Sequence, residues 1–197
     1  MNRPSWKPTA DQELLLHAAL DPIPDALAAW RMWSARALPP ETLDTDSFKL
    51  LPLVCTTLAD HLGDNPMLPL LREITAAQSA KTLTALGRAA RAIALLNTEG
   101  IETVLLKGAS LLAMKVTNLK ARPMTDADIL IAPDDRARAL KVLLAAGWVS
   151  KHPIPVTRYP LIHSLDLSFH ADGSGLDLHW YALWDNRQPG ADRAFVE

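Results

Sequence analysis

The sequence has little of several features that mark specialised classes of protein. Cys55 is the single cysteine among 197 residues, which excludes an intramolecular disulfide bond. The apolar segment 51–54 before it predicts that Cys55 is a small buried side chain rather than a reactive thiol. No run of about 18 apolar residues is present, and the first residues contain no apolar segment of signal-peptide length. We therefore expect a cytoplasmic protein that is neither exported nor inserted into a membrane.

The chain also has no excess of positive charge. It has 20 lysine and arginine residues against 22 aspartate and glutamate residues, for a formal net charge of -2 and a pI near 6.3. Binding to nucleic acid or an anionic membrane needs concentrated positive charge, so the chain as a whole has no nucleic-acid-binding signature. With 49% hydrophobic and 21% charged residues, the composition excludes the disordered and fibrous classes. No repeat of fixed period is present, which excludes a solenoid.

Residues 1–99 are predicted to form an N-terminal helical region. The segment Thr9-Ala10-Asp11-Gln12 has the capping-box pattern, in which the hydroxyl and amide side chains each bond a backbone N–H group of the other residue. An apolar run to Leu20 follows it. The spacing of the apolar residues predicts further helices from Pro24, over about residues 46–62, and over about residues 68–97 as one long helix or two with a break.

After Gly100 the pattern changes to short β-rich segments that alternate with helices, which predicts an α+β fold. We expect strands at 102–106, 127–131 and 148–149, and helices at 108–116 and from an Asp134 cap to Gly147. Segments 161–169 and 176–181 predict an antiparallel hairpin, in which Gly173 and Gly175 supply positive φ angles. We assign residues 100–185 to an α+β core and residues 186–197 to a C-terminal tail, which leaves open that the chain is truncated.

Three aspartates in this core are candidates for metal binding. Asp126 and Asp128 are two residues apart on a predicted strand, so both carboxylates project to the same face. At an effective dielectric constant of about 20, two such charges about 6 Å apart repel by roughly 3 kcal/mol. A hard divalent cation between them, Mg²⁺ or Mn²⁺ in its place, would turn that cost into affinity. If the strand that carries Asp177 pairs beside them, three carboxylates converge, as two-metal phosphoryl transfer requires.

A glycine turn upstream is a candidate phosphate site. Gly108 ends a predicted strand and starts a helix, so a phosphate can approach the backbone N–H groups there. Lys107 can add a positive charge and Ser110 a hydrogen bond, while the planar guanidinium of Arg122 can bind phosphate oxygens as a fork. His179 shares a face with Asp177 and has three readings: a phosphate contact, a group that orients a carboxylate, or an ordinary half-buried histidine.

Three motifs resemble those of an uncharacterised bacterial nucleotidyltransferase family within the DNA polymerase beta-like superfamily. The motifs are residues 105–111 (LLKGASL), 122–131 (RPMTDADILI) and 176–180 (LDLHW), and the resemblance covers about residues 47–183. It implies a small mixed sheet with flanking helices, and Mg²⁺ held by Asp126 and Asp128. It further implies that Asp177 helps to activate an acceptor hydroxyl and that Gly108 and Ser110 hold nucleotide phosphates.

The implied reaction moves a nucleoside monophosphate from an NTP to an acceptor and releases pyrophosphate. The donor is ATP, GTP, CTP or UTP, and the acceptor is a protein, a small molecule or an RNA; the sequence does not choose among them. Two departures from the superfamily pattern motivate an alternative of another class: Ala109 follows Gly108, where Gly-Gly or Gly-Ser is usual, and the sequence given ends soon after the third motif. The alternative is a catalytically weak or inactive nucleotide-binding or interaction module of the same fold.

Two further readings rank lower. An RNA-directed nucleotidyltransferase toxin ranks third, because the sequence carries no basic patch. A zinc site from His163, Asp166, His170 and His179 is disfavoured: alternation turns the first two to opposite faces of their strand, and His170 lies near the hairpin tip.

Overall fold

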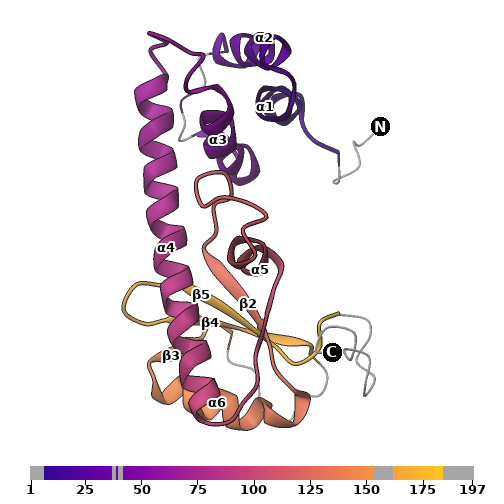
Figure 1. Cartoon of the computed structure of the whole chain (residues 1–197), viewed down its shortest axis with the longest axis vertical. Helices are drawn as coiled ribbons and strands as arrows, with labels where there is room; N and C mark the ends of the chain where they lie inside the picture. The colour runs from indigo at the N-terminus through magenta and orange to yellow at the C-terminus, as the bar shows by residue number, and fades with distance from the viewer. Residues whose placement is uncertain (1–6, 37–38, 40–41, 153–161, 184–197) are drawn as a thin grey trace. The chain divides into compact units, whose positions relative to one another are not determined.

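A computed structural model describes residues 7–36, 39, 42–152 and 162–183 (Figure 1). The chain forms two compact units. One comprises residues up to 80 together with 118–123, and the other comprises residues 81–117 with those from 124 onward. The predicted boundaries at residues 99 and 185 stay predictions, and the predicted tail, residues 186–197, lies outside the described residues. No described helix is long and apolar enough to cross a membrane.

The first unit is helical, as the spacing of its apolar residues predicts. Its helices are α1 (Ala10–Leu20), α2 (Ile23–Ser34), α3 (Thr45–Leu58) and the first turns of α4 (Leu68–Thr98), which is one unbroken helix. The capping box is confirmed: Gln12 N donates to Thr9 Oγ1 at 3.1 Å, and Thr9 N donates to Gln12 Oε1 at 2.8 Å. Apolar side chains from all four of these helices, Leu15, Trp30 and Leu58 among them, fill the core, and Cys55 is buried there as predicted.

The second unit is built on a five-stranded mixed sheet. The strands are β1 (Val104–Leu106), β2 (Asp126–Leu130), β3 (Trp148–Ser150), β4 (Ser164–Phe169) and β5 (Gly175–His179), in the order β1-β2-β5-β4-β3. β2 and β5 are parallel, and the other neighbours are antiparallel. Helices α5 (Lys107–Ala113) and α6 (Arg136–Ala145) complete the unit. The α+β class, the mixed sheet with helices and the β4–β5 hairpin are confirmed.

The start of α6 differs from the expectation. A 3-10 turn, η2 (Pro133–Asp135), precedes it, and Asp135 rather than Asp134 occupies the N-cap position without a side-chain capping bond. Pro133 explains the shift, because its fixed φ suits the first position of a helical turn and starts that turn early.

One face of the sheet is apolar and buried. Alternate residues of β2, β4 and β5 point to this face and pack with the C-terminal part of α4 and with α6; they include Ala127, Ile129, Leu165, Leu167, Leu176 and Leu178. Each fully buried leucine or isoleucine contributes roughly 1.5–3 kcal/mol. Because strand side chains alternate, the residues between them project to the opposite, polar face. The hydrophobic core thereby fixes which side chains form the polar face.

The hairpin loop contains only one of the two positive φ angles expected. Gly173 has a φ of +71°, but Gly175 is a strand residue of β5 without a positive φ. Gly175 lies opposite Asp126 across the parallel pair. A β-carbon at Gly175 would lie 2.7 Å from Asp126 Cβ and 3.2 Å from the carbonyl oxygen of Thr125. Gly175 is therefore needed for the close approach of β5 to the start of β2.

Replacement of Gly175 tests this close approach. We expect Gly175→Ala to lower the free energy of unfolding by about 1–3 kcal/mol, because the added methyl group overpacks the β2–β5 contact. The matched control is Gly87→Ala in the middle of α4, where a β-carbon meets no atom within 4 Å. That change should stabilise by up to about 1 kcal/mol. Urea denaturation measures both, and an undiminished stability of Gly175→Ala would contradict the packing argument.

Candidate functional site

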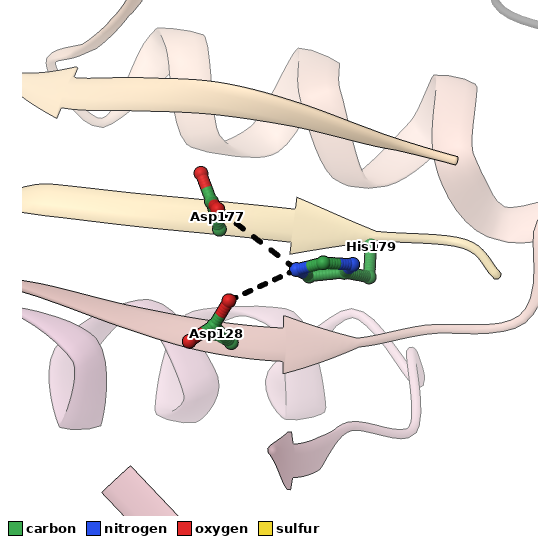
Figure 2. Close-up of side chains that lie close together, drawn as sticks. All are labelled: Asp128, Asp177 and His179. Carbon is green, nitrogen blue, oxygen red and sulfur yellow. Dashed lines mark hydrogen bonds and ion pairs between the residues drawn. The ribbon is translucent and has the colours of Figure 1, made fainter. Parts of the chain in front are cut away.

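Two aspartates and one histidine meet on the polar face of the sheet. Asp128 of β2 lies directly opposite Asp177 of β5, and His179 follows two residues later on the same face. His179 Nε2 lies 3.0 Å from Asp128 Oδ1 and 4.0 Å from Asp177 Oδ2 (Figure 2). One ligand atom of each of the three lies within 4.8 Å of the others. The side chain of Asp128 is 13% exposed, that of Asp177 is 26% exposed and that of His179 is 2% exposed. The two carboxylates are therefore partly accessible to solvent, whereas the imidazole is buried.

Asp126 lies at the margin of this cluster. It is the first residue of β2, it is exposed, and it shares the polar face with Asp128. Its partner across the parallel pair is Gly175, whereas Asp128 faces the carboxylate of Asp177. Among the described residues, Asp128, Asp177 and His179 form the group of suitable metal-binding geometry. The sequence-based set of Asp126, Asp128 and Asp177 as metal ligands stays a prediction.

Lys107 brings a positive charge to the three predicted aspartates. It is the first residue of α5, with a φ of +48°, and its Nζ donates to Asp128 Oδ1 at 2.5 Å. Burial lowers the pKa of Lys107, but the bond to Asp128 and the charges of Asp128, Asp177 and Asp126 outweigh that effect and raise it. Burial raises the pKa of Asp128, because it disfavours the charged carboxylate. The hydrogen bonds from His179 and Lys107 lower this pKa by more, so the net shift is downward. Asp128 is therefore held ionised.

The other predicted phosphate contacts lie around α5 and the loop before β2. Gly108 is buried at the start of α5. Ser110 Oγ donates to the carbonyl oxygen of Lys107 at 2.8 Å, so its hydroxyl proton bonds the local backbone. Arg122 lies in the segment 118–123, which belongs to the first unit, whereas the aspartates belong to the second unit. Arg122 is therefore not described as a member of this site. The phosphate-binding roles of Lys107, Gly108, Ser110, Arg122 and His179 stay predictions.

Asp166 is a member of the site that sequence reasoning did not assign to it. It lies on β4 directly opposite Asp177, and the two carboxyl groups are hydrogen-bonded. Burial, then the bond to Asp166 and the charges of Asp166 and Asp128, raise the pKa of Asp177 to about 7. The same bond is the main cause that lowers the pKa of Asp166. The register decides this contact, because Ser168 pairs with Gly175 and residue 166 therefore lies opposite residue 177. The loop expected from the sequence, residues 171–175, does not give that register.

The disfavoured zinc set is not assembled among the described residues. Asp166 faces Asp177, as described, and His170 bonds the carbonyl oxygen of Gly147 through Nδ1 at 2.9 Å. The ring of His163 packs edge-on against that of His179, with centroids 5.3 Å apart.

The donor set fits a divalent cation. Two carboxylates on neighbouring strands repel each other, and the charge of Asp128 adds to burial and to Asp166 in raising the pKa of Asp177. A cation bound between them would replace that repulsion by attraction, and carboxylate oxygens are the ligands that hard divalent ions prefer. The polar face can therefore hold a metal ion.

Asp177 should make the stability of the metal-free protein depend on pH. Its pKa is about 7 in the folded chain against 3.8 for an ordinary aspartate, so the folded state binds more protons than the unfolded state between these values. The free energy of unfolding should therefore fall as the pH rises from about 4 to about 7. The pKa of Asp166 is lowered, so Asp166 changes charge below this window and does not cancel the slope.

Urea denaturation at pH 5 and pH 8 in the presence of a chelator measures this effect. We expect Asp177→Asn to flatten the decline in stability that the wild-type chain shows. Asp134→Asn is the control, because Asp134 is exposed and lies outside the site. Equal slopes for the wild type and Asp177→Asn would show that Asp177 does not hold its proton in the folded state.

Comparison with known proteins gives one finding of family membership. The model of an uncharacterised nucleotidyltransferase family matches residues 46–196, which is more than half of the chain. The matched range includes Asp128, Asp166, Asp177 and His179 of the polar face. A search of curated proteins finds no match. The family match confirms the resemblance carried by the three motifs and implies a nucleotide as substrate. The chain belongs to this uncharacterised nucleotidyltransferase family.

Proposed function

We propose that the protein is a metal-dependent enzyme that transfers a nucleoside monophosphate from an NTP to an acceptor hydroxyl. The observation that carries the proposal is the pairing of Asp128 with Asp177 on parallel neighbouring strands in a chain of a nucleotidyltransferase family. A bond forms between the acceptor oxygen and the α-phosphorus of the NTP. The bond from that phosphorus to the bridging oxygen breaks, and pyrophosphate leaves with the electron pair.

Asp126, Asp128 and Asp177 would hold Mg²⁺, or Mn²⁺ in its place. The ion would neutralise the phosphate charge and favour the attacking alkoxide. Asp177 lies on the strand that separates Asp128 from Asp166. We assign to it the withdrawal of the proton from the acceptor hydroxyl. A carboxylate in hydrogen-bond reach of a hydroxyl is a suitable general base.

The distribution of charge supports one orientation of the substrates. Lys107 lies beside Asp128 on the β1 side of the site, where its ammonium and the start of α5 suit the NTP phosphates. Asp166 and Asp177 lie on the β4 side, where a phosphate would be repelled. We therefore place the triphosphate toward β1 and the acceptor toward β4.

The first test is calorimetric titration of ATP, GTP, CTP and UTP, each with and without Mg²⁺. We expect Mg²⁺-dependent binding of at least one NTP, and we expect Asp126→Asn/Asp128→Asn to weaken it by about tenfold or more, because the metal loses charged ligands. Asp134→Asn is the matched control, since it makes the same chemical change at an exposed position outside the site.

The second readout follows an α-labelled NTP into protein, RNA and small-molecule fractions of a cell extract, together with pyrophosphate release. Asp177→Asn should lower transfer by roughly 100-fold or more while NTP binding persists. Binding without transfer by the wild type would favour the inactive module. Binding that is equally tight in the double variant would remove the aspartates from the site.

A further inference from the structure

His179 is the most buried side chain of the cluster and has two roles open to it. Its ring is 2% exposed, and Nε2 points at Asp128 Oδ1, 3.0 Å away. Figure 2 shows the imidazole at the end of β5, with Nε2 directed toward both carboxylates. It can be a third metal ligand, with a bare Nε2. It can instead be a hydrogen-bond donor to Asp128, with the proton on Nε2.

The other ring nitrogen decides between these roles. Nδ1 of His179 is buried and has no hydrogen-bond partner among the described residues. A metal bound at Nε2 would require the proton on Nδ1, which would then be a buried donor without an acceptor among the described residues. Histidines that bind metals almost always donate the second N–H to a neighbouring group. With the proton on Nε2, Nδ1 stays unpaired as a bare acceptor, but Nε2 gains a charge-assisted hydrogen bond to an ionised carboxylate.

The contacts of Asp128 point the same way. Both donors, His179 Nε2 and Lys107 Nζ, bind the same oxygen, Oδ1. Two donors on one oxygen fix the plane of the carboxylate and leave Oδ2 to face a ligand. Two contacts hold His179 in place. Its backbone carbonyl oxygen accepts from Ile131 N at 3.0 Å, and its ring packs on the ring of His163. The donor is thus preorganised by the sheet.

We propose that His179 is a positioning residue that holds Asp128 through an Nε2–H to Oδ1 hydrogen bond and thereby presents Oδ2 to the metal ion. The proposal rests on the proposed function, since it assigns the ion to the carboxylates. His179 acts through Asp128 and contacts neither the ion nor the phosphates. This role explains why a buried polar side chain lies beneath the acidic cluster.

Two substitutions separate a positioning donor from a ligand. His179→Gln keeps an N–H donor at a similar reach, whereas His179→Leu removes it. With Mn²⁺ alone as the probe, titrated by electron paramagnetic resonance, we expect His179→Leu to weaken binding by about 10- to 100-fold. His179→Gln should restore most of it. His170→Gln is the matched control, because His170 lies in the same unit and bonds a backbone carbonyl outside the site.

Long-range proton–nitrogen NMR of the wild-type chain, residues 1–197, gives an independent readout, which holds even if His179→Leu does not fold. We expect the proton of His179 on Nε2 before and after addition of Mg²⁺. A bare Nε2, or His179→Gln as weak in Mn²⁺ binding as His179→Leu, would overturn the proposal. A wild-type chain that keeps the Nε2 proton and the glutamine rescue, but transfers no nucleotide, would count against the proposed function and in favour of this role for His179.

Discussion

The parallel pairing of β2 with β5 is the constraint on which the rest of the site depends. It places Asp128 beside Asp177 at a fixed register, on strands separated by a single ladder of hydrogen bonds. At an effective dielectric constant of about 20, charges about 5 Å apart repel by roughly 3 kcal/mol. The neighbouring groups offset this cost in three ways. Lys107 adds a positive charge, His179 adds a donor, and burial together with Asp166 raises the pKa of Asp177, which favours its uncharged form.

The register is maintained from the opposite face. A slip of one residue would turn the apolar side chains of β2 and β5 to solvent and the carboxylates into the core. Ile129 and Leu178 are fully buried, and they alternate with Asp128, Asp177 and His179 along the same strands. The packing that stabilises the unit is thus also what aligns its acidic groups, and Gly175 permits the two strands to approach at their first residues.

The sequence predicted the elements better than it predicted their neighbours. The capping box of Thr9, the α+β class and the hairpin follow from local patterns, because caps, alternation and turn residues act over a few positions. The pairing of β2 with β5 is a contact between segments about 50 residues apart. The sequence did not predict this pairing, and the convergence of the aspartates was expected only if it occurs. Asp166 was missed for the same reason. Its partner is decided by the hairpin register, which the loop 171–175 does not determine by composition alone.

The sequence predicts Asp126 and Asp128 as the pair that attracts a cation, because both lie on one strand. The tertiary structure adds a second pair, Asp128 and Asp177, on neighbouring strands. Alternation within one strand separates like charges by two residues, whereas neighbouring strands bring them closer. The pKa of Asp177 is therefore raised by groups on β4 and β2, after burial, and not by a neighbour along its own strand. A cation bound at this face would act mainly across the strands. The chemistry of the site is consequently a property of the sheet order β1-β2-β5-β4, with a lysine at one side of the paired aspartates and a third carboxyl group at the other.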